Sequence, residues 1–374
     1  MYLHLICEPV ESSALWITDI MDGIVRESMK KSLNLAAVTD GSFTGSLYRT
    51  DSEISHLPVL VIGASLPWIN ETLTRLHELH AEPVLVSVYQ HRFHCEYSSV
   101  SFNTEEAMRE LIGYLAKNGK KRIALFGLHR STIGDLSKLS GFAAGIRDAS
   151  LKLRTGDIYS RGLIADCAAK LFEKIDDYDA VVCTSDLIAI YLSLYLEQRG
   201  VRIPKDICIT GFGNWSFADR FQPSITRMYT DLFELGAQAV RLHQQLMYNP
   251  QLRHCRAILE CSLRIGESTG LAPCGPKLSA SVIPPQGNMS APPYSDDPDI
   301  METLKSELFV RSTDGTDLAV LNGLVTGATY AQIAESANIS ESTVKYRLSK
   351  MLRLLDFTDR RQLTGFAEKY KLLI

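Results

Sequence analysis

The stretch AVVCTSDLIAIYLSLYLEQRGVRIPKDICITGF, residues 180–212, decides the fold. It contains two short apolar runs, 180–185 and 207–212, with a helical pattern between them. Because each run is continuously apolar rather than alternating, both predict parallel strands that are covered on two faces. Similar runs recur upstream at 3–7, 33–39, 57–63, 83–89 and 122–127. The front of the chain is therefore predicted to be α/β, with two doubly wound halves.

The composition is that of a globular protein with only a weak net charge. The chain has 374 residues, a net charge of −4, 45% hydrophobic and 22% charged residues. Its eight cysteines form no CxxC pair and no metal-type spacing with histidine, so we expect a reducing, cytoplasmic compartment and no metal site. No run approaches the length of a membrane span, and no membrane partner is expected.

Patterns associated with catalysis fail in detail. GASLP (63–67) follows a strand but ends in proline, where a nucleophile elbow requires a small residue. HELH (77–80) has the wrong histidine spacing for a zinc protease, and NGKK (118–121) lacks the glycines of a phosphate loop. GFGNWS (211–216) has too few glycines for a dinucleotide fingerprint. We therefore expect neither an enzyme nor a cofactor.

A change of composition divides the chain. Residues 268–300 hold seven of the fourteen prolines, and glycine and serine fill much of the remainder. Such a segment buries little apolar area, which predicts a flexible linker; an ordered loop is the alternative. The predicted domains are therefore a front piece at 1–267 and a small back piece at 301–374.

The front piece resembles the effector domain of the lactose/galactose-repressor (LacI/GalR) family. The resemblance rests on the order of CTSD, RGVRIPKD, GFGN, PSIT and ELG within residues 180–240, and it extends over about 1–267. It implies two α/β subdomains that close around a small ligand, about 1–97 with 230–250 and 98–228 with 255–267. Members of that family begin with an N-terminal DNA-binding headpiece. This chain begins at the first strand, so either it does not bind DNA or its DNA-binding module lies elsewhere in the sequence.

The resemblance implies ligand contacts at Trp16, Lys138, Ser185, Asp186, Gly213, Asn214 and Thr230. Lys138 replaces a family arginine, Gly213 replaces the first acid of the family's GFDD, and Thr230 replaces a glutamine. Simpler roles stay open for some of them. Trp16 can pack in the core, Lys138 can be a solvated charge, and Asp186 can cap a helix.

The back piece predicts a helix-turn-helix. Residues 316–326 have a helical period, 330–338 form a short helix with a turn at Asn338, and Ser340 is placed to cap a third helix. On that helix Val344, Leu348, Met351, Leu352 and Leu355 share one face, which must be buried. Residues 340–361 contain six Lys or Arg against three acids, so the opposite face is basic and suited to the major groove.

The same segment resembles the LuxR/NarL-type C-terminal module through VLNGLVTGATYAQIAESANISESTVKYRL, residues 320–348. By that resemblance Lys345, Tyr346 and Ser349 approach base edges. Thr343, Arg347 and Lys350 hold phosphates, and Arg353 lies on the same basic face. The expected protein is a DNA-binding transcriptional regulator with a small-molecule effector, acting as a homodimer on double-stranded DNA. The alternative is a cytoplasmic small-molecule receptor whose helical tail binds a protein partner.

Overall fold

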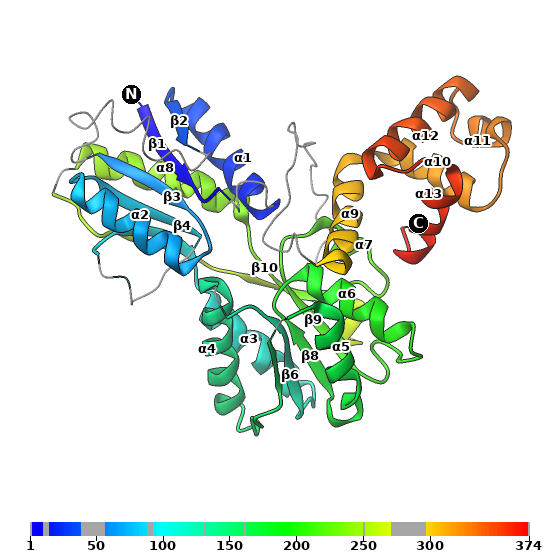
Figure 1. Ribbon diagram of the computed structural model, residues 1–374, viewed down its shortest axis with the longest axis horizontal. Helices are drawn as coiled ribbons and strands as arrows, with labels where there is room; N and C mark the ends of the chain where they lie inside the picture. The colour runs from blue at the N-terminus through cyan, green and yellow to red at the C-terminus, as the bar shows by residue number, and fades with distance from the viewer. Residues whose placement is uncertain are drawn as a thin grey trace.

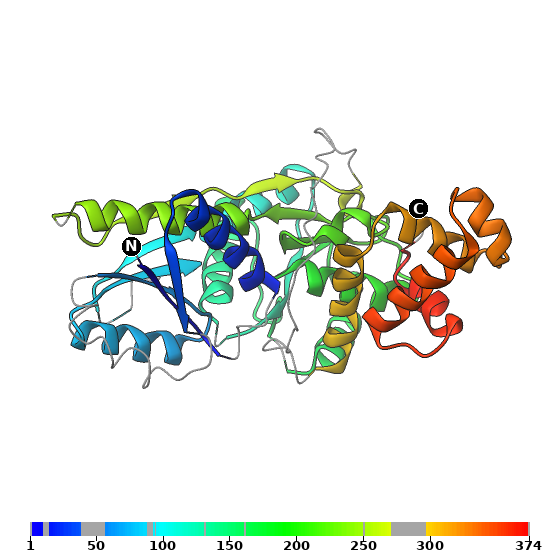
Figure 2. The same ribbon diagram turned by 90° about the horizontal axis from the view of Figure 1, so that it is seen from above.

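A computed structural model of the protein describes residues 2–9, 15–38, 57–87, 93, 95–130, 132–160, 162–249, 251–270 and 297–372. These residues form two α/β lobes and a helical C-terminal arm that projects from the second lobe (Figures 1 and 2). Lobe 1 comprises described residues within 2–102 and 232–259, lobe 2 those within 103–230 and 262–270, and the arm comprises 297–372. The predicted fold class is confirmed.

Lobe 1 contains a six-stranded sheet in the order β11-β5-β4-β3-β1-β2, whose pairs are all parallel. Its strands are β1 (Tyr2–Cys7), β2 (Asn34–Val38), β3 (Pro58–Ile62), β4 (Glu82–Ser87), β5 (Ser98–Phe102) and β11 (Arg256–Leu259). Its helices are α1 (Leu15–Lys30), α2 (Leu66–Glu78) and α8 (Leu232–Tyr248). Alternate residues of β3 point to opposite faces of the sheet. Leu60 packs against α1 and α8, whereas Val59 and Val61 pack against α2.

Lobe 2 contains a second six-stranded sheet in the order β12-β10-β9-β8-β6-β7, parallel except for β12. Its strands are β6 (Ile123–Leu128), β7 (Ile158–Ser160), β8 (Ala180–Cys183), β9 (Cys208–Gly213), β10 (Thr226–Tyr229) and β12 (Ser262–Arg264). Its helices are α3 (Thr104–Lys117), α4 (Ile133–Asp148), α5 (Ile164–Phe172), α6 (Asp186–Glu197) and α7 (Ser216–Arg220). Helices α3 and α4 pack on one face, and α5 and α6 on the other.

The division between the lobes differs from the expected one. Residues 98–102 were expected in the second subdomain but form β5, which pairs with β4 of lobe 1. Residues 256–259 were also expected there but form β11, which pairs with β5. The chain therefore crosses between lobes after Phe102, after Tyr229 and after Leu259. Backbone pairing explains the difference. Strand β11 lies parallel to β5, with Arg256 opposite Ser99, and forms the edge of the first sheet.

One glycine lets α8 lie close against α1. A Cβ atom at Gly236 would lie 2.0 Å from the Ile20 carbonyl oxygen, closer than any side chain tolerates. Gly236 is the glycine of the ELG motif, so a packing requirement between helices explains that part of the sequence pattern.

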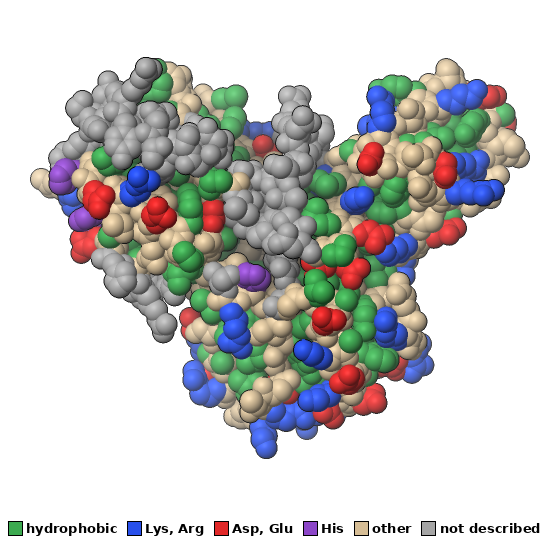
Figure 3. Space-filling model, viewed as in Figure 1, with side chains coloured by type: hydrophobic (Ala, Val, Ile, Leu, Met, Phe, Trp, Pro, Cys, Tyr) green, Lys and Arg blue, Asp and Glu red, His purple; other side chains and the backbone are tan. Residues whose placement is uncertain are grey.

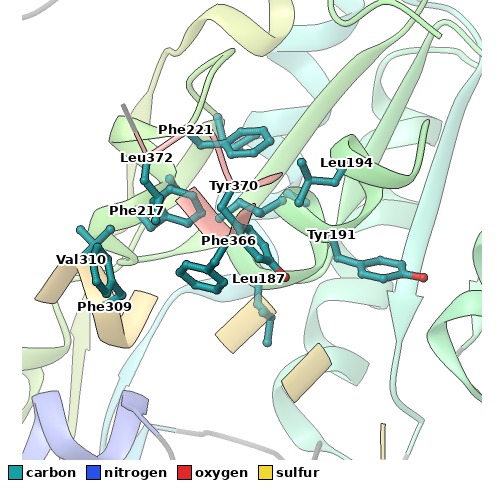
Figure 4. Packing of buried hydrophobic residues seen from close by; sticks show 14 of the residues in the cluster. Leu187, Tyr191, Leu194, Phe217, Phe221, Phe309, Val310, Phe366, Tyr370 and Leu372 are labelled. Carbon is teal, nitrogen blue, oxygen red and sulfur yellow. The ribbon is translucent and has the colours of Figure 1, made fainter. Parts of the chain in front are cut away.

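The arm consists of α9 (Pro298–Ser312), α10 (Gly315–Val325), α11 (Tyr330–Ser336), α12 (Glu341–Leu355) and α13 (Arg360–Lys369). Its core is continuous with the α5–α7 side of lobe 2. Tyr370 of the arm lies 6.4 Å from Phe217 of α7, and 4.8 Å from Phe366 of α13, between ring centroids; Figure 4 shows these rings together. The arm is thus docked on lobe 2.

Both ends of the expected linker, 268–270 and 297–300, are packed on lobe 2 rather than flexible, so 268–300 was too wide a range for it. Residues 267–269 form a short 3-10 helix, and the buried Ser268 hydroxyl donates to the Ile209 carbonyl in lobe 2. At the other end, the Asp297 carboxylate caps α9 and also accepts from the Ile164 amide of α5. The central part of the expected linker, 271–296, lies outside the described residues. Within the described residues, no helix is long and apolar enough to cross a membrane.

A buried histidine in lobe 1 makes stability sensitive to acid. Burial, with the nearby charge of His4, lowers the pKa of His243 on α8 to about 4. Its folded pKa is below the ordinary value of 6.5, so the neutral form supports folding above pH 6.5, and that support is lost as pH falls towards 4. We expect His243→Gln to remove about 3 kcal/mol of the acid-induced loss of unfolding free energy. Urea titrations of both proteins between pH 7 and 4 measure this; parallel pH curves would contradict it.

Candidate ligand site and nucleic-acid interface

Most residues expected to contact a ligand lie at the carboxyl edge of the second sheet, where parallel α/β folds bind small molecules. Ser185 and Asp186 follow β8, Gly213 and Asn214 end and follow β9, and Thr230 follows β10. Trp16 enters from α1 of lobe 1 and is partly buried against the lobe 1 core. The Asn214 side-chain amide donates to Asp19 of α1 at 2.8 Å, so this edge faces lobe 1.

Lys138 is not a free solvated cation. Its Nζ donates to the Thr184 carbonyl oxygen at 2.7 Å and to the Asp135 carboxylate at 3.1 Å. It also lies 5.0 Å from the centre of the Phe212 ring. These contacts hold Lys138 at the ends of β8 and β9, beside the other expected ligand residues.

The helix cap of α6 is Ser185, whose side chain accepts from the Ile188 amide. Asp186 is instead fully buried, accepts from the Trp215 amide at 3.1 Å, and lies 3.6 Å from Nε of the buried Arg227. Burial raises the pKa of Asp186 to about 6, although the Arg227 charge lowers it. Oδ1 of Asp186 and two nitrogens of Arg227 have no hydrogen-bond partner among the described residues.

Gly213 has a backbone conformation that favours glycine. Its φ is +147°, and a Cβ atom there would lie 3.0 Å from Oδ2 of Asp186. An acid at this position would set a second carboxylate against Asp186. The Thr230 amide donates to the Gly213 carbonyl oxygen at 3.3 Å, and Thr230 itself is buried.

A separate surface pocket on lobe 2 is lined by Tyr159, Ser160, Asp166 and Lys170, among others. It contains none of the expected ligand residues. Over the part of the chain that the structure describes, no group of three or more His, Cys, Asp or Glu side chains could hold a metal ion.

In the arm, α10, α11 and α12 pack around Leu321, Ile333 and Val344. Local signals set the helix ends as expected. Gly327 and Asn338 adopt positive φ after α10 and α11, and the Ser340 hydroxyl caps α12 by accepting from the Thr343 amide. Val344, Leu348, Met351 and Leu355 are buried, whereas Leu352 is half-buried.

The opposite face of α12 is open to solvent. Lys345, Tyr346, Ser349 and Arg353 are exposed, and Tyr346 retains 62% of its accessible surface. Figure 3 shows Lys and Arg side chains on the surface of the arm, which points away from both lobes. A short helix, a turn and a second helix with a polar, basic outer face is the arrangement of a helix-turn-helix.

Comparisons with known proteins agree with both parts. Residues 112–269 match the model of a periplasmic binding protein-like domain, and 316–367 match that of bacterial regulatory proteins of the luxR family. The chain therefore combines a domain of the periplasmic binding protein type with a luxR-type helix-turn-helix. Among curated relatives, the HTH-type transcriptional repressor PurR of Vibrio vulnificus is 24% identical over 243 residues, which cover 62% of this chain and 71% of the relative. Catabolite control protein A of Staphylococcus epidermidis is 27% identical over 199 residues, covering 51% and 58%.

Solved structures share the fold of the two lobes of this chain. A LacI-type regulator from Bacillus cereus subsp. cytotoxis has a TM-score of 0.61 and 20% identity, covering 70% of this chain and 95% of that one. The regulator CcpA of Lactococcus lactis has a TM-score of 0.61 and 18% identity, covering 72% and 100%. A complex of the regulator CelR with cellobiose has a TM-score of 0.59 and 18% identity, covering 71% and 84%.

Two cations of α12 are already paired within the arm. Arg347 and Lys350 contact the Asp317 carboxylate of α10 at 2.9 and 2.6 Å, and Asp317 is fully buried. Arg347 also pairs with Asp314, and these acids raise its pKa above the ordinary value through hydrogen bonds. Thr343 is half-buried beside the Ser340 cap.

Three residues that sequence reasoning missed lie between the lobes and the arm. Glu307 and Arg311 of α9 contact each other at 2.7 Å, and Arg311 also contacts Asp19 of lobe 1. A signal was present in the sequence, because Glu307 and Arg311 are one helical turn apart and flank the apolar pair Phe309 and Val310. Opposite charges at that spacing, beside apolar residues of the same helix, indicate a buried ion pair.

Proposed function

We propose that the chain is a one-component regulator in which a small metabolite binds between the lobes and α12 of the arm binds double-stranded DNA. The observation that carries the proposal is the division of α12 into a buried apolar face and an exposed face containing Lys345, Tyr346, Ser349 and Arg353. A docked arm that buried this face could not reach a groove. Here the face is exposed while the arm remains packed on lobe 2.

The ligand half of the proposal rests on convergence. Five of the expected ligand residues meet at the carboxyl edge of one sheet: Ser185, Asp186, Gly213, Asn214 and Thr230. At the same edge, Oδ1 of Asp186 and two nitrogens of the neighbouring Arg227 are buried without a hydrogen-bond partner among the described residues. Unsatisfied buried polar atoms are costly and mark places where a polar ligand can bind. We propose a sugar or another small polar metabolite, bound by Asn214, Lys138 and Asp186, with Trp16 available to stack on one face.

Cooperation of two copies fits the DNA half. One helix-turn-helix makes few phosphate contacts, so specific binding at physiological salt calls for two modules on a palindromic site. We propose a cytoplasmic homodimer.

Lys345→Ala is expected to weaken DNA binding by the full-length chain about 5- to 150-fold, equivalent to 1–3 kcal/mol for a lost base contact. Lys345 is exposed, and its removal leaves the Asp317 ion pairs intact. Fluorescence anisotropy with an operator selected from random duplexes measures the affinity at two salt concentrations.

Lys369→Ala is the matched control for that experiment. It removes an exposed cation of the same arm, which pairs with Glu302 rather than lying on α12, and it should bind within twofold of the wild type. Equal binding by Lys345→Ala and the wild type would contradict the assigned DNA face. If the full-length chain shows no salt-dependent duplex binding, the regulator proposal fails and a protein partner for the arm becomes the next candidate.

A further inference from the structure

Polar contacts join α9 of the arm to both lobes at once. The Glu307 carboxylate is fully buried and accepts from the Ser216 and Phe217 amides of α7 at 2.9 and 2.7 Å. It also contacts Nε of Arg311 at 2.7 Å. One helix of the arm is therefore tied to lobe 2 by a charge that is removed from water.

Arg311 carries the connection across to lobe 1. Its two terminal nitrogens donate to the two oxygens of Asp19 at 2.6 and 3.0 Å, in a bidentate pair. The Arg311 and Asp19 side chains are only 11% and 16% exposed. Asp19 also accepts from Asn214 of lobe 2 at 2.8 Å, so one carboxylate of lobe 1 contacts both lobe 2 and the arm.

We propose that Glu307 and Arg311 form a clasp, by which we mean the contacts that hold α9 to α7 of lobe 2 and to Asp19 of lobe 1. The strength of these contacts depends on how the two lobes are arranged. Movement of α1 away from Asn214 takes Asp19 away from Arg311 and leaves that guanidinium poorly solvated beside Glu307. The Glu307–Arg311 ion pair then remains, but the two terminal nitrogens of Arg311 lose their acceptors on Asp19, and poorly solvated donors without acceptors are costly. Such a movement therefore loosens α9, and by reciprocity the loss of the clasp favours separation of the lobes.

This clasp deepens the proposed function and rests on it for its regulatory meaning. The face of α12 that contains Lys345, Tyr346, Ser349 and Arg353 is exposed, so the clasp controls where the arm is held rather than whether its proposed DNA face is open. A metabolite that changes the spacing of the lobes would change the position of the helix-turn-helix through Asp19 and Arg311. The connection is direct contact, and it needs no signal through residues 271–296.

The decisive variant lies in lobe 1, far in sequence from the helix that it is expected to loosen. Asp19→Asn keeps the shape of the side chain and removes the charge that Arg311 contacts. We expect amide hydrogen exchange in α9, and at Ser216 and Phe217, to become at least tenfold faster in the full-length chain without ligand or DNA. Arg311→Gln should give a similar increase, and the double variant should not exceed the larger single effect, because both changes break one contact.

Lys369→Gln is the matched control, since it breaks an exposed ion pair between α13 and Glu302 of the same α9 and should leave α9 exchange unchanged. Arg311→Lys retains a charge without the bidentate fork and should fall between the wild type and Arg311→Gln. Unchanged α9 exchange in Asp19→Asn, with α1 itself still protected, would overturn the proposal because lobe 2 alone would then hold the arm. Independent, additive effects of the two variants would overturn it as well.

A final measurement separates the clasp from the proposed function. Small-angle scattering should show a larger radius of gyration for Arg311→Gln than for Lys369→Gln, with no DNA present. If the exchange and scattering results appear but wild-type protein binds no duplex, the clasp stands and the regulator proposal fails. If the wild type binds duplex and the clasp variants match it in both exchange and scattering, the regulator proposal stands and the clasp is rejected.

Discussion

Replacing Arg347 and Lys350 together with alanine is expected to lower the free energy of unfolding by about 3–5 kcal/mol. The reason is Asp317, which is fully buried and has these two cations as its ion-pair partners. Without them the carboxylate stays buried with backbone contacts at the start of α10 and no compensating charge. Urea denaturation of the full-length chain, followed by circular dichroism of the helices, measures the loss.

Two further variants isolate the buried charge as the cause. Lys345→Ala with Arg353→Ala removes two exposed cations from the same helix and should change stability by no more than about 0.5 kcal/mol. Adding Asp317→Asn to the Arg347 and Lys350 double variant should recover most of the loss, because the uncompensated charge is gone. A double variant as stable as the wild type would show that Asp317 reaches water without its cations.

This stability effect changes how the residues proposed to contact DNA must be tested. Arg347 and Lys350 match positions where the luxR-type pattern implies phosphate contacts, and the structure ties both to Asp317. Loss of DNA binding after their removal would therefore combine a lost contact with a weakened fold. Lys345 and Arg353 do not have this second role in the described structure, so they report on the proposed DNA face alone.

The strands that could be predicted from sequence are those whose own residues are apolar. The runs at β1, β2, β3, β4, β6, β8 and β9 were expected, and the structure has a strand at each. Strand β5 was not expected because its sequence is SSVSF, and Ser98, Ser99 and Ser101 are buried by tertiary packing rather than by their own hydrophobicity. Strands β7, β11 and β12 are short edge strands with weak local signals. Missing β5 and β11 displaced the expected lobe boundary.

The helix ends of the arm could be predicted because their signals are local. A serine cap at 340 and left-handed residues at 327 and 338 depend on a few neighbouring residues. The docking of the arm could not, since Arg311 and Asp19 are 292 residues apart. For the proposed ligand site, the family resemblance suggested Asp186 and Asn214. Their partners, Arg227 and Asp19, became visible only when the sheets were assembled.

Tyr370→Ala is expected to destabilise the protein by about 3–5 kcal/mol and to separate the unfolding of the arm from that of the lobes. The side chain is 1% exposed and belongs to two contacts at once. Within the arm it packs on Phe366, and across to lobe 2 it packs on Phe217. Truncation leaves a cavity at the junction shown in Figure 4, so calorimetry should show the arm melting first.

Two further tyrosine variants test whether the loss of stability comes from ring packing at this junction rather than from the removal of any tyrosine in the arm. Tyr346→Ala removes an exposed tyrosine from the same arm and should change stability by no more than about 0.5 kcal/mol. Tyr370→Phe keeps the ring between Phe366 and Phe217 and should retain most of the stability, with a single unfolding transition. A Tyr370→Ala protein that melts in one transition at the wild-type temperature would contradict docking of the arm through this core. The clasp at Arg311 would then have to hold α9 without the support of the aromatic contact.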